Sequence, residues 1–477
     1  MKKEVGKVVS AEHPIVARKI DESLNLSVRE GSLASVSTGF GLSYFSPFVL
    51  VMNATSAQVG ILYAITSLLP SIIQLRTSGL LRKFSRKKLV LAGLLGKILL
   101  WIPIFITAIL FYLGVPHMVW VFIGLVSLFY ALTAVSHPAW FSWMGSLVPD
   151  EKRGKYFSRR NRAAGFFGVL TMIAGAVILD MSKGIGVYFG NVLGFTLLGF
   201  GLLFVFSALV RIWSLVLLKK QYEPRIKIRK KDYFSLRQFL GKCVDTPFGR
   251  FTLFRGALSF VVAIAGPFWA VYMLRNLGFS YVWYILVTVA AIVFQLVFLP
   301  LLGKMSDRFG NIKIMRICSW LIVMTPLLWI LSSFIVDGFL MRIYLLIVPS
   351  IVGGFAWAGY NLAVNNYVYD AVKAPKRSFG LTYMNLFVGV GMFLGASLGA
   401  LLAWVDVSFM NPLLFIFMVS GVGRLVVTII GLRFLKEVRH VKKFSSHYLI
   451  KEFRPVEGIV REVHYLEHLV EKVEHYV

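Results

Sequence analysis

Long apolar runs constrain the fold of this chain more than any other feature. Stretches of about 20 residues with few charges recur along most of the sequence, and each can cross a ~30 Å hydrocarbon core as an α-helix. Hydrophobic residues make up 57% of the chain, well above the roughly 45–50% of a soluble domain. The mean hydropathy of +0.75 agrees. The sequence therefore predicts an all-α polytopic membrane protein.

Twelve spans can be placed, and the longest interruption between them, 219–250, divides them into six and six. We therefore predict two six-helix bundles, 31–218 and 251–435, joined by a basic cytoplasmic linker, 219–250. A cytoplasmic N-terminal segment, 1–30, and a cytoplasmic tail, 436–477, flank them. The predicted spans are 31–52, 58–78, 88–113, 118–146, 161–181, 190–218, 251–275, 281–302, 313–336, 340–369, 378–403 and 411–435.

The distribution of charge sets the orientation. The formal net charge is +29, and 43 of the 51 Lys and Arg lie in the N-terminus, alternate loops and tail. Only Lys183, Arg275 and Arg342 fall at the opposite loops. This asymmetry follows the positive-inside rule and predicts a multi-pass protein of the cell membrane with both termini cytoplasmic. We expect the basic loops to face lipid head groups rather than nucleic acid. The first 29 residues show no cleavable signal pattern, so the first span is expected to direct membrane insertion.

The two predicted bundles repeat each other in sequence. A shift of about 224 residues superposes polar residues and glycines in register, and a shift of 225 superposes the loops after the second and eighth spans. Parallel repeats of this kind occur in transporters built from two related halves. The matching pairs are Arg153/Arg377, Ser158/Thr382, Asn161/Asn385, Gly165/Gly389, Gly175/Gly399, Phe84/Phe309 and Lys88/Lys313.

The stretch Gly303–Lys313 reads Gly-Lys-Met-Ser-Asp-Arg-Phe-Gly-Asn-Ile-Lys and is expected to form a short loop. It resembles the loop signature of the major facilitator superfamily of transporters, and Val148–Gly154 and Ala374–Ser378 resemble further elements of that family. The resemblance covers roughly residues 30–435. The signatures of drug/proton antiporters, peptide symporters and sugar porters are missing, so no subfamily can be assigned.

The resemblance implies that helices 1, 4, 7 and 10 line a central substrate cavity. His137 and Asn361 lie 224 residues apart, at equivalent positions of the two halves. Polar groups at mid-membrane are costly unless they line water or find partners, although they can also bond neighbouring helices. The aromatic candidates can equally pack against lipid. The predicted cavity residues are Tyr44, His137, Trp140, Trp269, Tyr272, Trp357 and Asn361.

Titratable groups inside the spans are few. The carboxylates nearest to the spans lie at span ends: Glu30, Asp180, Asp337 and Asp370. A proton is one candidate coupling ion, because His137 has an unperturbed pKa of about 6.5. Use of an end carboxylate, or uncoupled transport, is equally open. Five basic residues within spans favour an anionic or zwitterionic solute, although three of them, Arg76, Arg211 and Arg255, are expected to snorkel toward the cytoplasmic face. The remaining two are Lys97 and Arg424.

The Gly303–Lys313 motif also implies a cytoplasmic gate. In the family this loop's aspartate, here Asp307, meets the start of the fifth helix, whose N-terminus carries partial positive charge. Arg82 replaces the aspartate in the first half, so we expect an asymmetric latch. The predicted gating residues are Gly303, Asp307, Arg308, Gly310, Arg153 and Arg377.

The predicted function is a secondary transporter that moves a small organic solute by alternating access. A carrier or exporter of a lipid-like substrate and a non-transporting membrane sensor remain alternatives. No cluster of metal ligands or catalytic side chains lies at mid-membrane, so we expect neither an enzyme nor a cofactor. We expect a monomer. The tail holds apolar residues at alternating 3–4 spacing over 456–477, which predicts an amphipathic helix that docks on the basic loops or forms a coiled coil.

Overall fold

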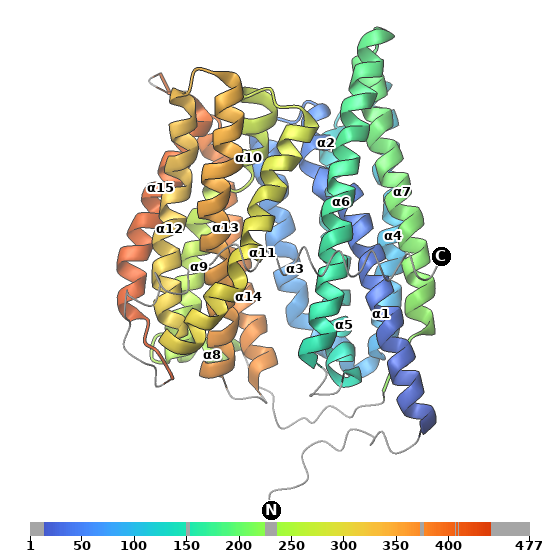
Figure 1. Cartoon of the computed structure of the whole chain (residues 1–477). Helices are drawn as coiled ribbons and strands as arrows, with labels where there is room; N and C mark the ends of the chain where they lie inside the picture. Colours follow the sequence, from blue (N-terminus) through green and yellow to red (C-terminus); the bar gives the residue numbers. More distant parts are fainter. Residues whose placement is uncertain are drawn as a thin grey trace, which may run out of the picture. The chain divides into compact units, whose positions relative to one another are not determined.

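The computed structural model describes residues 14–148, 153–224, 236–372, 376–405, 407–408 and 410–439. Within these ranges the chain is helical, and 12 helices are long and apolar enough to cross a membrane. The helices are labelled in Figure 1. The predicted class, an all-α protein with twelve membrane spans, is confirmed. The amphipathic tail helix predicted over 456–477 lies outside the described residues.

Nineteen helical elements follow one another along the described part of the chain. They are α1 (Pro14–Phe40), η1 (Leu42–Tyr44), α2 (Phe45–Val51), α3 (Ser56–Lys83), α4 (Arg86–Tyr112), α5 (Met118–Leu147), α6 (Arg153–Tyr188), α7 (Val192–Lys220), α8 (Leu236–Gly241), α9 (Pro247–Ala265), α10 (Phe268–Val271), η4 (Tyr272–Asn276), α11 (Tyr281–Phe309), α12 (Asn311–Leu331), η5 (Ser332–Phe334), α13 (Gly338–Ala371), α14 (Arg377–Leu402), α15 (Pro412–Gly431) and η7 (Leu432–Phe434).

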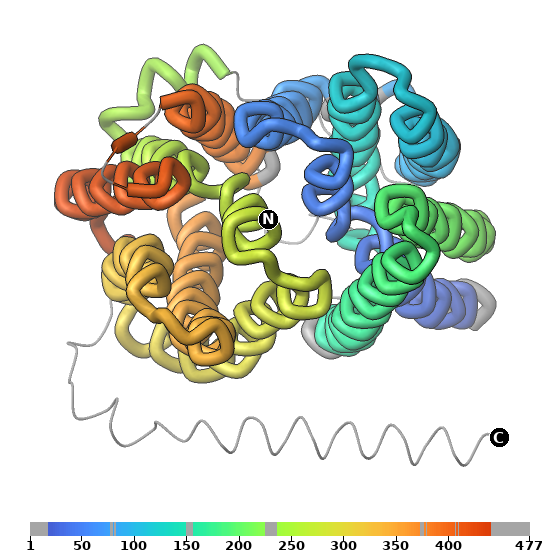
Figure 2. The backbone as a smooth tube through the Cα atoms, turned by 90° about the horizontal axis from the view of Figure 1, so that it is seen from above, coloured from blue at the N-terminus to red at the C-terminus, as the bar shows by residue number. Residues whose placement is uncertain are grey.

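The helices group into two compact units. Unit 1 comprises residues 1–231, 266–285 and 392–404, and unit 2 comprises 232–265, 286–391 and 405–477. In unit 1, α1, α6 and α7 pack side by side, as do α4 and α5. In unit 2, α12 packs between α13 and α15, which Figure 2 shows along the helices. Two stretches from the second half of the sequence, 266–285 and 392–404, therefore belong to unit 1.

Local sequence explains where the helices begin and bend. Thr55 and Gln58 form a capping box at the start of α3, which satisfies two backbone N–H groups that the helix itself leaves free. The seventh span is interrupted at Gly266-Pro267, between α9 and α10. Proline removes a backbone donor and clashes with the preceding turn, so a kink is expected there. The division between units 2 and 1 falls at this same break.

The expectation of a loop at Gly303–Lys313 is wrong. Helix α11 continues to Phe309, and α12 begins at Asn311. Only Gly310 lies between them, with φ of 92°. Met305 and Phe309, in the last turns of α11, are buried. Glycine adopts the left-handed region without steric cost, so Gly310 alone makes the sharp turn.

The core of unit 1 is an aromatic cluster between α2, α4, α5 and α7. Phe48 contacts Phe122 edge-on with ring centroids 5.0 Å apart, and Phe204 at 5.1 Å. Trp101 and Phe45 extend the cluster at 5.6 Å. Edge-to-face pairs add to the burial of apolar area, so these rings fix the positions of the helices that carry the polar residues described next.

Candidate functional site

The predicted cavity residues of α5 lie at the surface of unit 1. His137 is exposed, and Trp140, one turn further on, is partly buried with its ring centroid 6.5 Å from that of His137. The buried indole Nε1 of Trp140 has no hydrogen-bond partner among the described residues. Tyr44 is fully buried instead, and its hydroxyl donates to the carbonyl of Met172 in α6. Tyr44 therefore ties α6 to the first span.

Arg160 of α6 connects this aromatic surface to a buried acid. Its guanidinium lies 4.3 Å from the centroid of the Trp140 ring, a distance typical of a cation–π contact. Its Nη2 atom lies 3.4 Å from Oε2 of Glu30 in α1. A Cβ at Gly31 would lie 2.8 Å from Cζ of Arg160. Glycine at position 31 therefore makes room for the guanidinium.

Glu30 holds two cations. Its second carboxylate oxygen, Oε1, accepts from Nη1 of Arg211 at 3.3 Å and from Oγ of Ser214 at 2.9 Å, both in α7. The Glu30 side chain is only 6% exposed. The structure thus places this carboxylate inside the first span, Arg18–Val51, rather than at its end. The expectation that Arg211 snorkels to the cytoplasmic face is wrong, because Arg211 pairs with Glu30.

Lys97 adds a third cation to this region of unit 1. Lys97 is 7% exposed and belongs to α4. Its Nζ atom lies 5.9 Å from the centroid of the Phe129 ring. No ion pair of Lys97 is present among the described residues. Two arginines therefore share the Glu30 carboxylate, and Lys97 is buried in the same unit without an ion pair among the described residues. A buried charge without a partner is costly, so this surplus of positive charge favours a negatively charged ligand.

Unit 2 presents a smaller polar surface on α13. Asn361 is exposed, as His137 is at the equivalent position of unit 1. The rings of Trp357 and Tyr360 meet edge-on with centroids 5.8 Å apart. The Tyr360 hydroxyl is buried and has no hydrogen-bond partner in the described part of the chain. Arg255 of α9 lies close enough for its charge to act on Tyr360, and its Nη1 donates to Sδ of Met384 at 3.3 Å.

The remaining predicted cavity residues, Trp269 and Tyr272, belong to unit 1. They follow the Gly266-Pro267 break, in α10 and at the start of η4. Tyr272 is 3% exposed, and Trp269 is partly exposed. Whether these residues share one cavity with His137 and Asn361 stays a prediction.

The predicted gating residues are distributed around the turn at Gly310. Asp307 and Arg308 are exposed on the last turn of α11. Gly303 belongs to the same helix, before that turn. Arg377 donates from Nε to the carbonyl of Val372 at 3.0 Å and so closes the turn before α14. The side chain of Arg153 lies outside the described residues. The contact expected for Asp307 stays a prediction.

Two other carboxylates bind the turn directly. Asp370 accepts from Nδ2 of Asn311 at 2.6 Å and forms an ion pair with Arg439 at 3.2 Å. Glu437 accepts from the backbone N–H of Ile312 at 2.9 Å, at the start of α12. Glu223 makes the corresponding contact with the N–H of Lys87, at the start of α4. Sequence analysis missed both glutamates, although each follows the last helix of its half.

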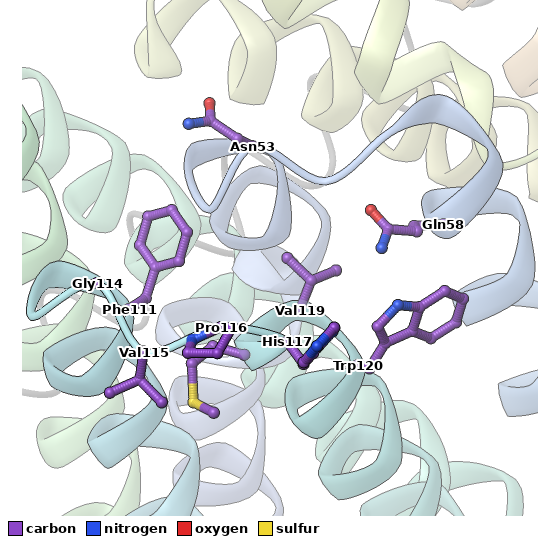
Figure 3. A pocket seen from close by; sticks show the side chains of 10 residues that line it. Asn53, Gln58, Phe111, Gly114, Val115, Pro116, His117, Val119 and Trp120 are labelled. Atoms are coloured by element: carbon purple, nitrogen blue, oxygen red, sulfur yellow. The ribbon is translucent and has the colours of Figure 1, made fainter.

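Two cavities open on unit 1. The larger, of about 400 Å³, is lined by the ends of α4 and α5 and by the turn after α2, and it includes His117, Trp120, Asn53 and Gln58 (Figure 3). The smaller, of about 130 Å³, is lined by Asp180, Lys183 and Arg275 among others. Neither contains a predicted cavity residue. No group of three or more potential metal ligands occurs within the described ranges.

Comparison with known proteins gives one family match. The sequence model described as "Major Facilitator Superfamily" matches residues 251–457. This match covers less than half of the chain, and it makes the second half similar to the Major Facilitator Superfamily. No curated relative matches the sequence. The match assigns no subfamily.

Solved structures share the fold of most of the chain. The nucleoside transporter NupG is 14% identical, with a TM-score of 0.64, covering 87% of this chain and 99% of that one. A bacterial homologue of the iron transporter ferroportin in its inward-facing state is 13% identical, with a TM-score of 0.64, covering 87% and 98%. The D-xylose-proton symporter is 14% identical, with a TM-score of 0.63, covering 89% and 99%. At these identities the similarity establishes the fold and leaves the substrate open.

Proposed function

We propose that this protein is a secondary transporter that moves a small organic solute by alternating access between its two six-helix halves. The main support is the exposure of His137 and Asn361 at equivalent positions of α5 and α13. Each is a polar side chain on a membrane helix, and such a side chain is costly where it faces lipid. Exposure at both equivalent positions is expected if the two residues face a common aqueous cavity.

The solute proposed is an organic anion or a zwitterion with an anionic group. In unit 2, Arg255 is partly buried on a predicted cavity helix, and its only hydrogen bond among the described contacts goes to a methionine sulfur. Sulfur is a weak acceptor. In unit 1, Arg160 and Arg211 share the carboxylate of Glu30, and Lys97 is buried without an ion pair among the described residues. A carboxylate or phosphate group on the solute would offset the cost of these cations, because guanidinium groups bind such anions with paired hydrogen bonds.

Coupling to a proton would involve Glu30. Arg160 contacts both Glu30 and the Trp140 ring beside His137. An anionic solute that binds Arg160 competes with Glu30 for the guanidinium. The carboxylate can then exchange that cation for a proton, so that solute and proton bind together. The D-xylose-proton symporter shares the fold, which is compatible with such coupling without requiring it.

The test begins with a thermal-stability screen of the purified chain against carboxylates, phosphate esters, amino acids, sugars and organic amines. A ligand that binds only the folded state raises its stability by mass action. We expect stabilisation by members of the anionic groups, lost in both Arg255→Gln and Asn361→Ala. The control is Arg424→Gln, because Arg424 already has acceptors at Ser420, Ile322 and Thr325. Stabilisation by amines alone would contradict the proposed solute class.

A further inference from the structure

The short helix α8 packs against the side of unit 2 through a buried aromatic ring. Phe239 is 4% exposed. Its ring centroid lies 5.5 Å from that of Tyr383 and 6.0 Å from that of Phe387, both in α14. The ring of Phe248, at the start of α9, lies 6.0 Å away. Phe239 therefore fixes α8 against two membrane spans of the same unit.

These contacts set the depth of α8 in the membrane. The eleventh span is Phe379–Leu402, with 24 residues. Tyr383 and Phe387 lie about 6 and 12 Å inside its first residue, at 1.5 Å per residue. The whole span is about 36 Å long, only slightly longer than a ~30 Å hydrocarbon core. Helix α8 therefore lies at the level of the lipid head groups and the adjoining acyl carbons, on the face that we predict to be cytoplasmic.

The α8 segment, residues 236–245, has an inner and an outer side. On the inner side, Cys243 is 4% exposed and donates from Sγ to the carbonyl of Gly249 at 3.6 Å. A Cβ at Gly249 would overlap the carbonyl oxygen of Cys243, so glycine allows the segment to pack this closely on α9. On the outer side, Leu240 is 52% exposed and Val244 is 66% exposed. The outer side therefore presents apolar side chains at the depth of the lipid.

Basic side chains border this apolar side. Arg237 and Lys242 are exposed, and no ion pair of either occurs among the described residues. Asp245, also exposed, is the only acidic residue in the sequence of the segment. Apolar side chains bordered by Lys and Arg are typical of a segment that lies in the membrane interface. Basic residues at this level attract the anionic lipids of the cytoplasmic leaflet.

We propose that the α8 segment is a binding site for an anionic phospholipid. The lipid phosphate contacts Arg237 and Lys242, and the acyl chains cover Leu240 and Val244. A guanidinium binds phosphate through two parallel hydrogen bonds, and the lysine ammonium adds a point charge. The site lies within unit 2 and is independent of the transported solute.

The test uses the purified chain in phosphatidylcholine vesicles, with an NBD fluorophore attached to the variant Leu240→Cys. Quenching by a nitroxide-labelled phosphatidylglycerol is compared with quenching by phosphatidylcholine carrying the same nitroxide. Because quenching requires contact, the ratio of the two gives the preference for anionic lipid at this segment. The native Cys243 and Cys318 are 4% and 0% exposed, and the chain without the reporter gives their background labelling.

We expect a preference for phosphatidylglycerol of about fivefold, which is the effect of the single net positive charge of the segment at a lipid surface. Arg237→Gln combined with Lys242→Gln should lower the ratio to one or below, and high salt should lower it in the parent. The matched control is Lys219→Gln combined with Lys220→Gln, at the end of α7 in unit 1. It removes the same charge from exposed residues and should leave the ratio unchanged.

Three results would overturn the proposal. Quenching by aqueous iodide but by neither lipid would place the reporter in water. Equal quenching by the two lipids would mean that the segment meets lipid without selecting a head group. An equal loss of preference in the α7 control would mean that the effect is one of total charge. Size-exclusion chromatography establishes that each variant is folded. If the double variant does not fold, Arg237→Gln and Lys242→Gln are measured singly, and each should lower the ratio by at least about half.

Discussion

Replacement of Glu30 by Gln should destabilise the protein far more than the same change at Glu22, eight residues earlier on α1. Glu30 is 6% exposed and pairs with Arg160 and Arg211, which are 16% and 18% exposed. Removing one partner of a buried pair typically costs about 3–5 kcal/mol, because a charge is left without compensation. The partial exposure of both arginines places the expected loss near the lower end, about 3 kcal/mol.

Glu22 provides the matched control. It pairs with Arg18 at 2.9 Å, with the two side chains 59% and 83% exposed. Exposed pairs of this spacing contribute roughly 0.3–0.5 kcal/mol at most. A loss of about 3 kcal/mol in the free energy of unfolding lowers the melting temperature of a domain of roughly 150–250 residues by about 6–12 °C. A shift of this size is measurable by fluorescence-detected chromatography after heating. Equal melting temperatures for Glu30→Gln and Glu22→Gln would refute the assignment of Glu30 as a buried counter-ion.

Three further predictions concern packing, gating and thiol reactivity. Gly391→Val should prevent folded expression, because even a Cβ there would lie 2.3 Å from the carbonyl oxygen of Gly256; Gly165→Val, with open space around it, should express normally on a chromatography trace. Asp307→Asn should shift the carrier toward the inward-facing state, and unchanged cysteine accessibility from the cytoplasmic side would count against the predicted latch. Burial raises the pKa of the Cys243 thiol, so less thiolate is present at neutral pH. Its maleimide labelling should therefore be slow at pH 7 and accelerate as the pH rises toward that raised pKa.

The number and type of the helices could be predicted from the sequence, because hydropathy is a local property. The same reasoning placed Glu30 at a span end, since the apolar run starts after it. The structure shows α1 beginning at Pro14 and carrying Glu30 well inside the first span. Polar residues can extend a membrane helix when other helices satisfy them, and that condition is not visible in a single segment.

The ion cluster was missed for the same physical reason. Arg160 and Arg211 lie 130 and 181 residues from Glu30 in sequence. A pattern search along the chain cannot pair them. Gly391 also approaches Gly256 of α9 closely, and the sequence does not show which helix packs against this glycine. Asp307 was expected in a loop and lies in the last turn of α11 instead. The carboxylates that bind the residues after Gly310 are Asp370 and Glu437.

The central claim, transport by alternating access, is tested most directly by counterflow in proteoliposomes. Vesicles containing the protein are loaded with the unlabelled solute found in the stability screen and diluted into a trace of the labelled form. A single site that faces each side in turn predicts a transient accumulation of label above equilibrium, absent from empty vesicles and reduced in His137→Ala with Asn361→Ala. Label that only rises to equilibrium, or never enters, would contradict the account.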